Sequence, residues 1–178
     1  MDTDIKKTWD IYNKIKPQYD SLGLYYENSK SAVTYFCTPK EANIFASMGV
    51  GGVHFCTISN HGDKIFVVSP EPYSKHHVFP VANNINEFFQ FVISLYGTQL
   101  IDQIPMFSKE QFEKIRDEHI KNNGNFISKD IKDFTNKFNI INQKLPVYDI
   151  VMGLYDGFDY STIKFSPLYY ETLGIDEE

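Results

Sequence analysis

The sequence predicts an α+β fold in which one antiparallel sheet, over residues 52–81, packs against helices. Two observations support this. The runs GVHFCTIS and KIFVVSP flank the turn NHGD, which is the pattern of a β-hairpin. In NNINEFFQFVISLYG, apolar residues recur at helical spacing and predict a helix over 85–96 on one face of the sheet. With 42% hydrophobic and 16% aromatic residues, the 178-residue chain is expected to form a single domain over 1–178.

The N-terminal half is expected to begin with an amphipathic helix, whose apolar stripe is Ile5, Trp9, Tyr12 and Ile15. A strand, SAVTYFC, follows. In TPKEANIFASMG, Thr38 and Glu41 have capping-box spacing and Gly49 suits a helix end, so a short helix is predicted there. The run VFPVA is predicted to be an edge strand, because Pro80 cannot donate to a ladder.

The C-terminal half is expected to add two helices to this layer, over about 109–121 and 129–139. Ser108 with Gln111 forms a capping box before the first, and Ser128 is expected to cap the second. The tyrosine-rich section from Leu145 to Phe165 alternates loosely and predicts one or two further strands. A C-terminal tail is expected to dock through Leu168, Tyr169 and Tyr170.

The charge and cysteine content limit the classes of partner. The formal net charge of -6 gives no attraction to phosphate, so nucleic acid is not expected and a basic partner is favoured. Cys37 and Cys56 lie in apolar runs and are too few for a disulfide framework. The first residues show no signal-peptide core and no apolar run nears ~20 residues, which predicts a cytoplasmic protein without a membrane segment. The oligomeric state stays open.

The stretch GVGGVHFCTISNHGD holds the residues that invite a ligand site. A phosphate loop needs its glycines between a strand and a helix, whereas here the predicted order is helix and then strand. A helix stop and a tight entry into the following strand at Gly49, Gly51 and Gly52 are therefore favoured over phosphate binding. His54 and Cys56 share a strand face, but zinc needs three or four ligands, so a packed face is favoured and neither metal nor cofactor is predicted.

His61 and Asp63 flank Gly62 at the expected hairpin tip, where they fit either turn chemistry or an oriented catalytic base. No nucleophile motif accompanies them. A small hydrolase that uses His54, His61 and Asp63 is kept as an alternative function, together with a small-ligand-binding protein lined by the many aromatic residues.

The connection EPYSKHH combines Tyr and His beside an expected sheet edge, which suits either a protein-binding surface or an ordinary solvated loop. Together with the hairpin tip, it supplies the residues predicted to bind a partner protein: Asp63, Glu71, Tyr73, His76 and His77.

Residues 40–96 resemble the SUKH superfamily, which includes bacterial toxin-immunity proteins and a fungal cell-wall regulator. The resemblance rests on Gly62-Asp63 at a hairpin turn, on Phe79 and Val81, and on the INEFFQFV helix that follows. Asn60-His61 stands where the family has Asn-Gly. The resemblance implies protein binding without catalysis. The predicted function is accordingly a non-enzymatic protein-binding domain, either an immunity protein that neutralises a toxin, with a basic toxin domain as its partner, or an adaptor.

Overall fold

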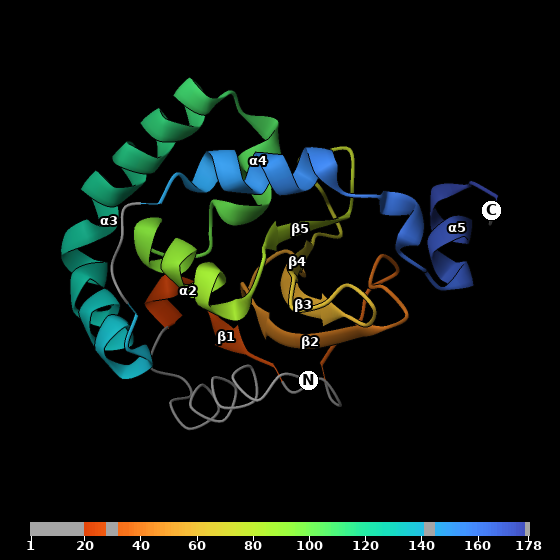
Figure 1. The fold of residues 1–178 in the computed structure, drawn as a ribbon, viewed down its shortest axis with the longest axis horizontal. Coiled ribbons are helices and arrows are strands. Elements are labelled where there is room, and N and C mark those ends of the chain that lie inside the picture. Colours follow the sequence, from red (N-terminus) through yellow and green to blue (C-terminus); the bar gives the residue numbers. More distant parts are fainter. Residues whose placement is uncertain (1–19, 28–31, 141–144, 177–178) are drawn as a thin grey trace.

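The computed structural model describes residues 20–27, 32–140 and 145–176. Its centre is a five-stranded antiparallel sheet in which each strand pairs with the next along the chain (Figure 1). The strands are β1 (Tyr25–Tyr26), β2 (Ala42–Ser47), β3 (His54–Ile58), β4 (Ile65–Val68) and β5 (Val78–Ala82). The α+β prediction is confirmed, and the sheet extends beyond residues 52–81 because β1 and β2 lie earlier in the chain.

Four α-helices and three short 3-10 helices accompany the sheet in the described ranges. The α-helices are α2 (Ile85–Ser94), α3 (Lys109–Phe138), α4 (Val147–Gly157) and α5 (Pro167–Leu173). The 3-10 helices are η1 (Asp20–Leu22), η2 (Ile101–Met106) and η3 (Tyr160–Thr162). In Figure 1, α2 lies between the sheet and α3, while α4 runs beside β5.

The elements with the clearest sequence signals are confirmed. β3 and β4 form the predicted hairpin, with Cys56 opposite Phe66. β5 is an edge strand, and it contains Pro80 as expected. The Asn84 side chain caps α2 by accepting from the Glu87 backbone N–H at 2.9 Å. The Ser108–Gln111 capping box at the start of α3 is also present.

The helix predicted in TPKEANIFASMG is wrong, because this segment is strand β2. Thr38 does not cap a helix. Its hydroxyl oxygen accepts from the Tyr35 backbone N–H at 2.8 Å and lies 3.3 Å from His54 Nε2. Ile44 and Phe45 are both buried, on opposite faces of the sheet, so pairing with β3 and burial on two sides outweigh the local helix signal.

The two helices predicted over 109–121 and 129–139 are one continuous helix, α3. Ser128 does not begin a second helix, because its hydroxyl donates to the Gly124 carbonyl within α3. The strands predicted after Leu145 are also wrong, since α4 occupies residues 147–157. The strand predicted in SAVTYFC is wrong, because residues 32–37 form no strand. The amphipathic helix predicted around Trp9 falls outside the described residues.

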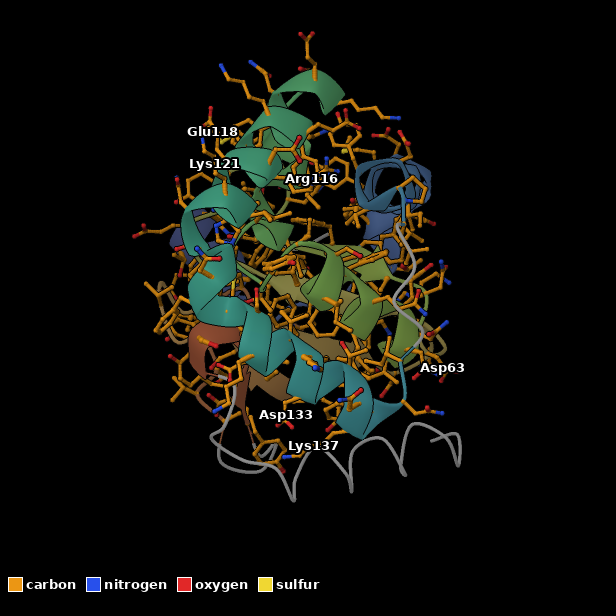
Figure 2. The ribbon with its side chains drawn as sticks, turned by 90° about the vertical axis from the view of Figure 1, so that its left-hand side faces the viewer. Asp63, Arg116, Glu118, Lys121, Asp133 and Lys137 are labelled. Atoms are coloured by element: carbon orange, nitrogen blue, oxygen red, sulfur yellow. The ribbon has the colours of Figure 1, made fainter. Side chains whose placement is uncertain are left out.

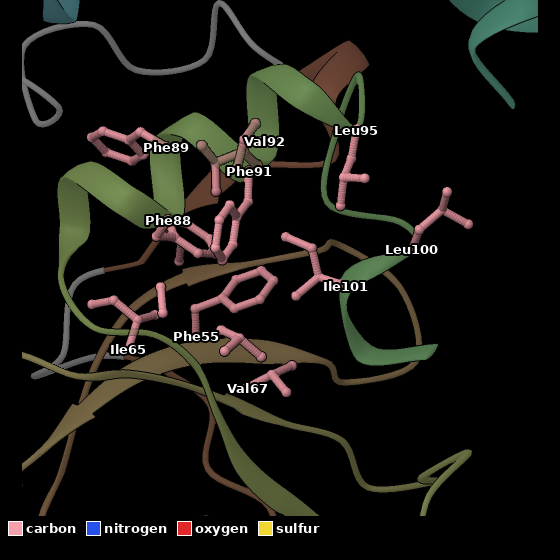
Figure 3. Packing of buried hydrophobic residues seen from close by; sticks show 14 of the residues in the cluster. Phe55, Ile65, Val67, Phe88, Phe89, Phe91, Val92, Leu95, Leu100 and Ile101 are labelled. Carbon is pink, nitrogen blue, oxygen red and sulfur yellow. The ribbon is translucent and has the colours of Figure 1, made fainter. Parts of the chain in front are cut away.

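Each face of the sheet is covered by its own apolar cluster. On the first face, Phe55 and Val67 point from the strands toward Phe88 and Phe91 of α2 (Figure 3). Phe134 of α3 meets Phe89 from the far side of α2, with ring centroids 5.1 Å apart. The second face is covered by residues 32–37 and 158–169, and its buried members are Cys37, Ile44, Cys56, Ile58, Phe66, Val68, Val78 and Ile163.

Candidate functional site

The glycine-rich stretch forms the turn between β2 and β3. Gly49, Gly51 and Gly52 have φ angles of 73°, 63° and 69°, which is the left-handed region that favours glycine. The turn closes through the Met48 N–H, which donates to the Val53 carbonyl at 2.9 Å. The helix stop predicted at these glycines is therefore wrong, whereas the tight entry into a following strand is confirmed, because β3 begins at His54. The segment is a hairpin turn without the following helix that a phosphate loop requires.

Two tyrosine rings lie against this turn. A Cβ atom at Gly49 would overlap the ring of Tyr25, and one at Gly52 would come within 2.5 Å of the ring of Tyr35. Both rings are partly exposed, Tyr25 at 37% and Tyr35 at 40%. The glycines are therefore required both by the backbone and by the close approach of the aromatic rings.

His54 fixes the turn to the preceding segment. Its Nδ1 lies 2.8 Å from the Gly52 carbonyl oxygen, which only accepts, so Nδ1 carries the proton. Nε2 then accepts from the Thr38 hydroxyl at 3.3 Å. The Tyr35 ring lies nearly parallel to the imidazole, with centroids 5.9 Å apart. Burial lowers the pKa of His54 below 6.5, outweighing the opposing effects of the Gly52 carbonyl and the Glu27 carboxylate. The ring is a neutral structural bridge at pH 7.

A cleft of about 340 Å³ opens beside the turn. Its floor is polar, with Ser47 donating its hydroxyl to Glu27 Oε1 at 2.8 Å. Its apolar lining is accessible: Val33 is 69% exposed, Val50 67% and Tyr35 40%. Exposed aliphatic and tyrosine side chains around a small polar centre are typical of protein-binding surfaces.

The described residues that line the cleft carry a single sign of charge. Among its described lining residues, Glu27 is the only carboxylate and there is no lysine or arginine. No residue that the structure describes bonds the second oxygen, Oε2, of Glu27. Within this part of the chain, that oxygen is an acceptor open to a donor from outside.

A second groove, of about 660 Å³, lies at the opposite end of the sheet beside the β3–β4 turn. Its charged lining residues are Glu41, Lys64, Asp159 and Lys164, which carry both signs. His61 lies against it, with its ring packed on Phe66 and Phe158 at centroid distances of 5.6 and 5.4 Å. The mixed charges favour no one class of ligand.

The residues of the hydrolase alternative do not converge. His54 begins β3 and pairs with Val68, whereas His61 and Asp63 follow the other end of the strand after Ile58. Four residue steps of strand separate the two ends by about 13 Å. His54 and Cys56 share the buried second face with Ile58, as the packed-face interpretation predicted.

The five predicted partner-binding residues divide between the two ends of β4. Asp63 lies in the β3–β4 turn, at the edge of the molecule and away from Arg116, Glu118 and Lys121 of α3 (Figure 2). Glu71, Tyr73, His76 and His77 lie in the β4–β5 loop, at the same sheet end as the glycine turn. Glu71 is exposed and Tyr73 is 56% exposed.

The two histidines of this loop pack against the C-terminal segment. His76 stacks on Tyr160 with centroids 3.5 Å apart and planes 4° apart. Burial, aided by the charge of Lys75, lowers the pKa of His76. His77 Nδ1 lies 3.0 Å from the Ser69 carbonyl, and its ring meets Phe36 edge-on at 5.2 Å. Both imidazole rings are thus largely engaged in contacts within the chain.

Sequence reasoning did not find Glu27, Val33, Tyr35, Ser47 or Val50. Glu27 and Tyr35 are separated from the glycines by at least 14 residues of chain. The pairing of β1 with β2 brings Glu27 close, and contacts with Thr38 and His54 bring Tyr35 close. The glycine run is the one local signal, since clustered glycines mark places where other groups approach the backbone closely.

Within residues 20–27, 32–140 and 145–176, no three His, Cys, Asp or Glu side chains gather to hold a metal ion. In the same part of the chain, no helix combines the length and the apolar character needed to cross a membrane.

Comparison with known proteins gave no match to any family model, curated protein or solved structure. The candidate site is therefore defined by its geometry: a glycine turn held by two tyrosines and His54, beside a cleft with an apolar rim and a carboxylate at its floor.

Proposed function

We propose that the protein is a non-enzymatic protein-binding domain whose partner docks on the cleft beside the β2–β3 turn. One observation carries the proposal: Val33, Tyr35 and Val50 stand exposed around a polar floor. Exposing aliphatic side chains to water costs about 25 cal/mol per Å² of apolar surface, and a docked partner would recover this cost. The turn itself is held rigidly, which limits the entropy lost on binding.

The partner surface that we propose extends along this end of the sheet to Glu71 and Tyr73. The β2–β3 turn and the β4–β5 loop are separated by two interstrand spacings, or about 10 Å. Glu27 and Glu71 give this end carboxylates, and the chain as a whole has a net charge of -6. Both favour a basic partner. The resemblance to the SUKH superfamily supports the same proposal, with a toxin-neutralising immunity protein or an adaptor as the role.

The first experiment places a photo-crosslinking amino acid at Val50, at Tyr73 or, as a control, at Glu118 on the exposed face of α3 (Figure 2). The full chain is expressed in its source cells. We expect a discrete adduct of higher mass from Val50 and Tyr73 and none from Glu118. Equal adducts from all three positions, or a crosslink within the chain itself, would overturn the proposal.

The second experiment measures how far the partner identified in this way depends on the rim. We expect Val50→Glu to weaken its binding at least tenfold, because hot-spot residues at an interface centre contribute on this scale. Phe126→Glu is the matched control, since Phe126 is 79% exposed on α3, away from the cleft. If both variants weaken binding equally, the docking site lies elsewhere. Co-expression with the partner, if it is toxic alone, distinguishes an immunity protein from an adaptor.

A further inference from the structure

We propose that the cleft receives one lysine or arginine side chain of the partner, with its cationic head on Glu27 and its stem along Val33, Tyr35 and Val50. The inference rests on the proposed function, which it makes specific. It follows from the combination of an apolar rim, a carboxylate floor and a volume suited to a single side chain.

The rim matches the stem of a basic side chain. Lysine and arginine carry three or four methylene groups that bury against apolar surface while the charged head reaches a polar group. Val33 and Val50 provide aliphatic contacts on the rim. The Tyr35 ring, held by stacking on His54, offers an aromatic face on which a guanidinium also stacks.

The polar floor of the cleft, formed by Glu27 and Ser47, suits the cationic head of a lysine or arginine side chain. Ser47 occupies Oε1 of Glu27 and thereby orients the carboxylate, while Oε2 has no bond to any residue in the described ranges. His54 adds no competing donor, because its Nδ1 proton is committed to the Gly52 carbonyl and its Nε2 accepts from Thr38. A hydrogen bond between a cation and a carboxylate is about twice as strong as a neutral one, and stronger still where water is partly excluded.

The size of the cleft selects a side chain over a larger ligand. A volume of about 340 Å³ is at the small end of the range for ligand sites. It accommodates one long side chain, and we expect the remaining partner contacts to fall on the rim and on the β4–β5 loop.

The test uses the full chain, labelled with ¹⁵N, and two small probes. Nα-acetyl-arginine amide carries the cationic head, and Nα-acetyl-citrulline amide has nearly the same shape without the charge. We expect saturable shifts of the Gly49, Gly51 and Gly52 amide signals with the arginine probe, and at least tenfold weaker binding of the citrulline probe.

The matched variants are Glu27→Gln and Glu118→Gln, the latter on the exposed face of α3. The first keeps an acceptor for Ser47 but removes the charge, so the affinity for the arginine probe should fall about tenfold. The second removes an equal charge outside the cleft and should leave the affinity within about twofold. Equal binding of both probes, an unchanged affinity in Glu27→Gln, or shifts confined to other parts of the chain would overturn the inference.

The outcome separates the inference from the proposed function. If the arginine probe fails to bind while Val50→Glu still abolishes binding of the crosslinked partner, the docking surface stands and the basic-side-chain inference falls. If the probe binds as expected but no partner crosslinks, the cleft recognises a basic group and the protein-binding proposal falls.

Discussion

Gly52 is constrained twice, by its backbone and by its neighbour. Its φ angle of 69° strains any other residue, and a Cβ would come within 2.5 Å of the Tyr35 ring. Gly51 has a similar φ of 63°, but its Cβ would stand 3.8 Å from Val53, which is an ordinary contact. The pair therefore separates the cost of the backbone angle from the cost of the overlap.

We expect Gly51→Ala to lower the free energy of unfolding by about 1 kcal/mol, the strain of a left-handed alanine. Gly52→Ala should cost about 1–3 kcal/mol more, since the Tyr35 ring must move as well. Urea denaturation of both variants measures the difference. In a Tyr35→Ala background the two substitutions should become equally costly, and a persistent gap would show that the ring is not the cause.

Asp102 is a buried carboxyl in η2, 3% exposed, whose Oδ1 has no hydrogen-bond partner among the described residues. Burial raises its pKa from 3.8 to about 6. In the folded state the carboxyl binds a proton at pH values where the unfolded chain has lost it. This group therefore makes stability fall as the pH rises from about 4 to 6, and the loss persists above that window.

We expect Asp102→Asn to raise the free energy of unfolding at pH 7.5 by about 1–2 kcal/mol. The pKa shift alone implies ~3 kcal/mol, but the buried amide also needs hydrogen-bond partners, which reduces the gain. At pH 4 the gain should disappear. Urea denaturation at both pH values measures this change in the free energy of unfolding. Asp117→Asn is the control, because the Asp117 carboxylate is 69% exposed. An equal gain at both pH values would refute the assignment to a buried charge.

At the scale of single elements, α3 shows how a helix continues through residues that usually end one. Asn122, Asn123 and Gly124 favour a break. The helix does not break because His119 and Gly124 contact Tyr96. The following half of α3 is also anchored, since it buries Ile127, Ile131 and Phe134. Tertiary packing therefore keeps the two halves of α3 on one axis. Ser21 also donates to Asp130 at 2.5 Å, which ties η1 to the middle of this helix.

Gly124 accordingly lowers the stability of α3, and replacing it by alanine should raise that stability. Its φ is not left-handed, and an added Cβ would lie 3.7 Å from Tyr96 Cε1 and 3.9 Å from Ile120 Cγ2, both ordinary contacts. We expect Gly124→Ala to raise the free energy of unfolding by about 0.5–1 kcal/mol. Gly62→Ala, with open space but a φ of 65°, should lower it by about 1 kcal/mol. Thermal and urea unfolding test both, and destabilisation by Gly124→Ala would mean that α3 bends at this residue.

How much could be predicted from the sequence depended on where the stabilising contacts lay. The hairpin of β3 and β4 and the helix α2 were predictable because their patterns are local and their turn or cap residues adjoin them. β2 was not, since Thr38, Pro39 and Glu41 match a helix start and only pairing with β3 decides otherwise. In the candidate site, the glycines and the packed position of His54 were visible in the sequence, whereas Glu27 joins them through sheet pairing and Tyr35 through its contact with His54.

At the scale of the whole molecule, the sheet is buried on both faces, but by different kinds of structure. The first face is covered by packed helices, while the second is covered by residues 32–37 and by the C-terminal segment that ends in α5. That segment attaches largely through rings: Tyr169 stacks on Phe165 with centroids 3.9 Å apart and faces Phe36 at 6.2 Å. Few regular hydrogen bonds join it to the sheet in the described ranges, so we expect the second face to open locally before the molecule unfolds.

Cys37 reports on that opening. It is fully buried under this segment, and burial raises the pKa of its thiol to about 11, so labelling at pH 8 requires the cover to move. We expect Tyr169→Ala to speed labelling of Cys37 about tenfold, because each aromatic pair contributes roughly 0.5–1.5 kcal/mol to the closed form. Cys56 lies on the same second face and is also fully buried, so it should keep its slow rate only if the opening is confined to the part of the cover around Tyr169.

Peptide mass mapping after timed alkylation measures the two cysteines separately. Leu168→Ala is the matched control, because Leu168 is on the same helix but 54% exposed, and it should leave both rates unchanged. An equal acceleration at Cys37 and Cys56 would mean that the whole cover of the second face opens. An unchanged Cys37 rate would mean that the second face is held by something other than the tyrosine ring. A selective effect at Cys37 would establish that the part of the cover around Tyr169 opens while the rest of the second face stays closed.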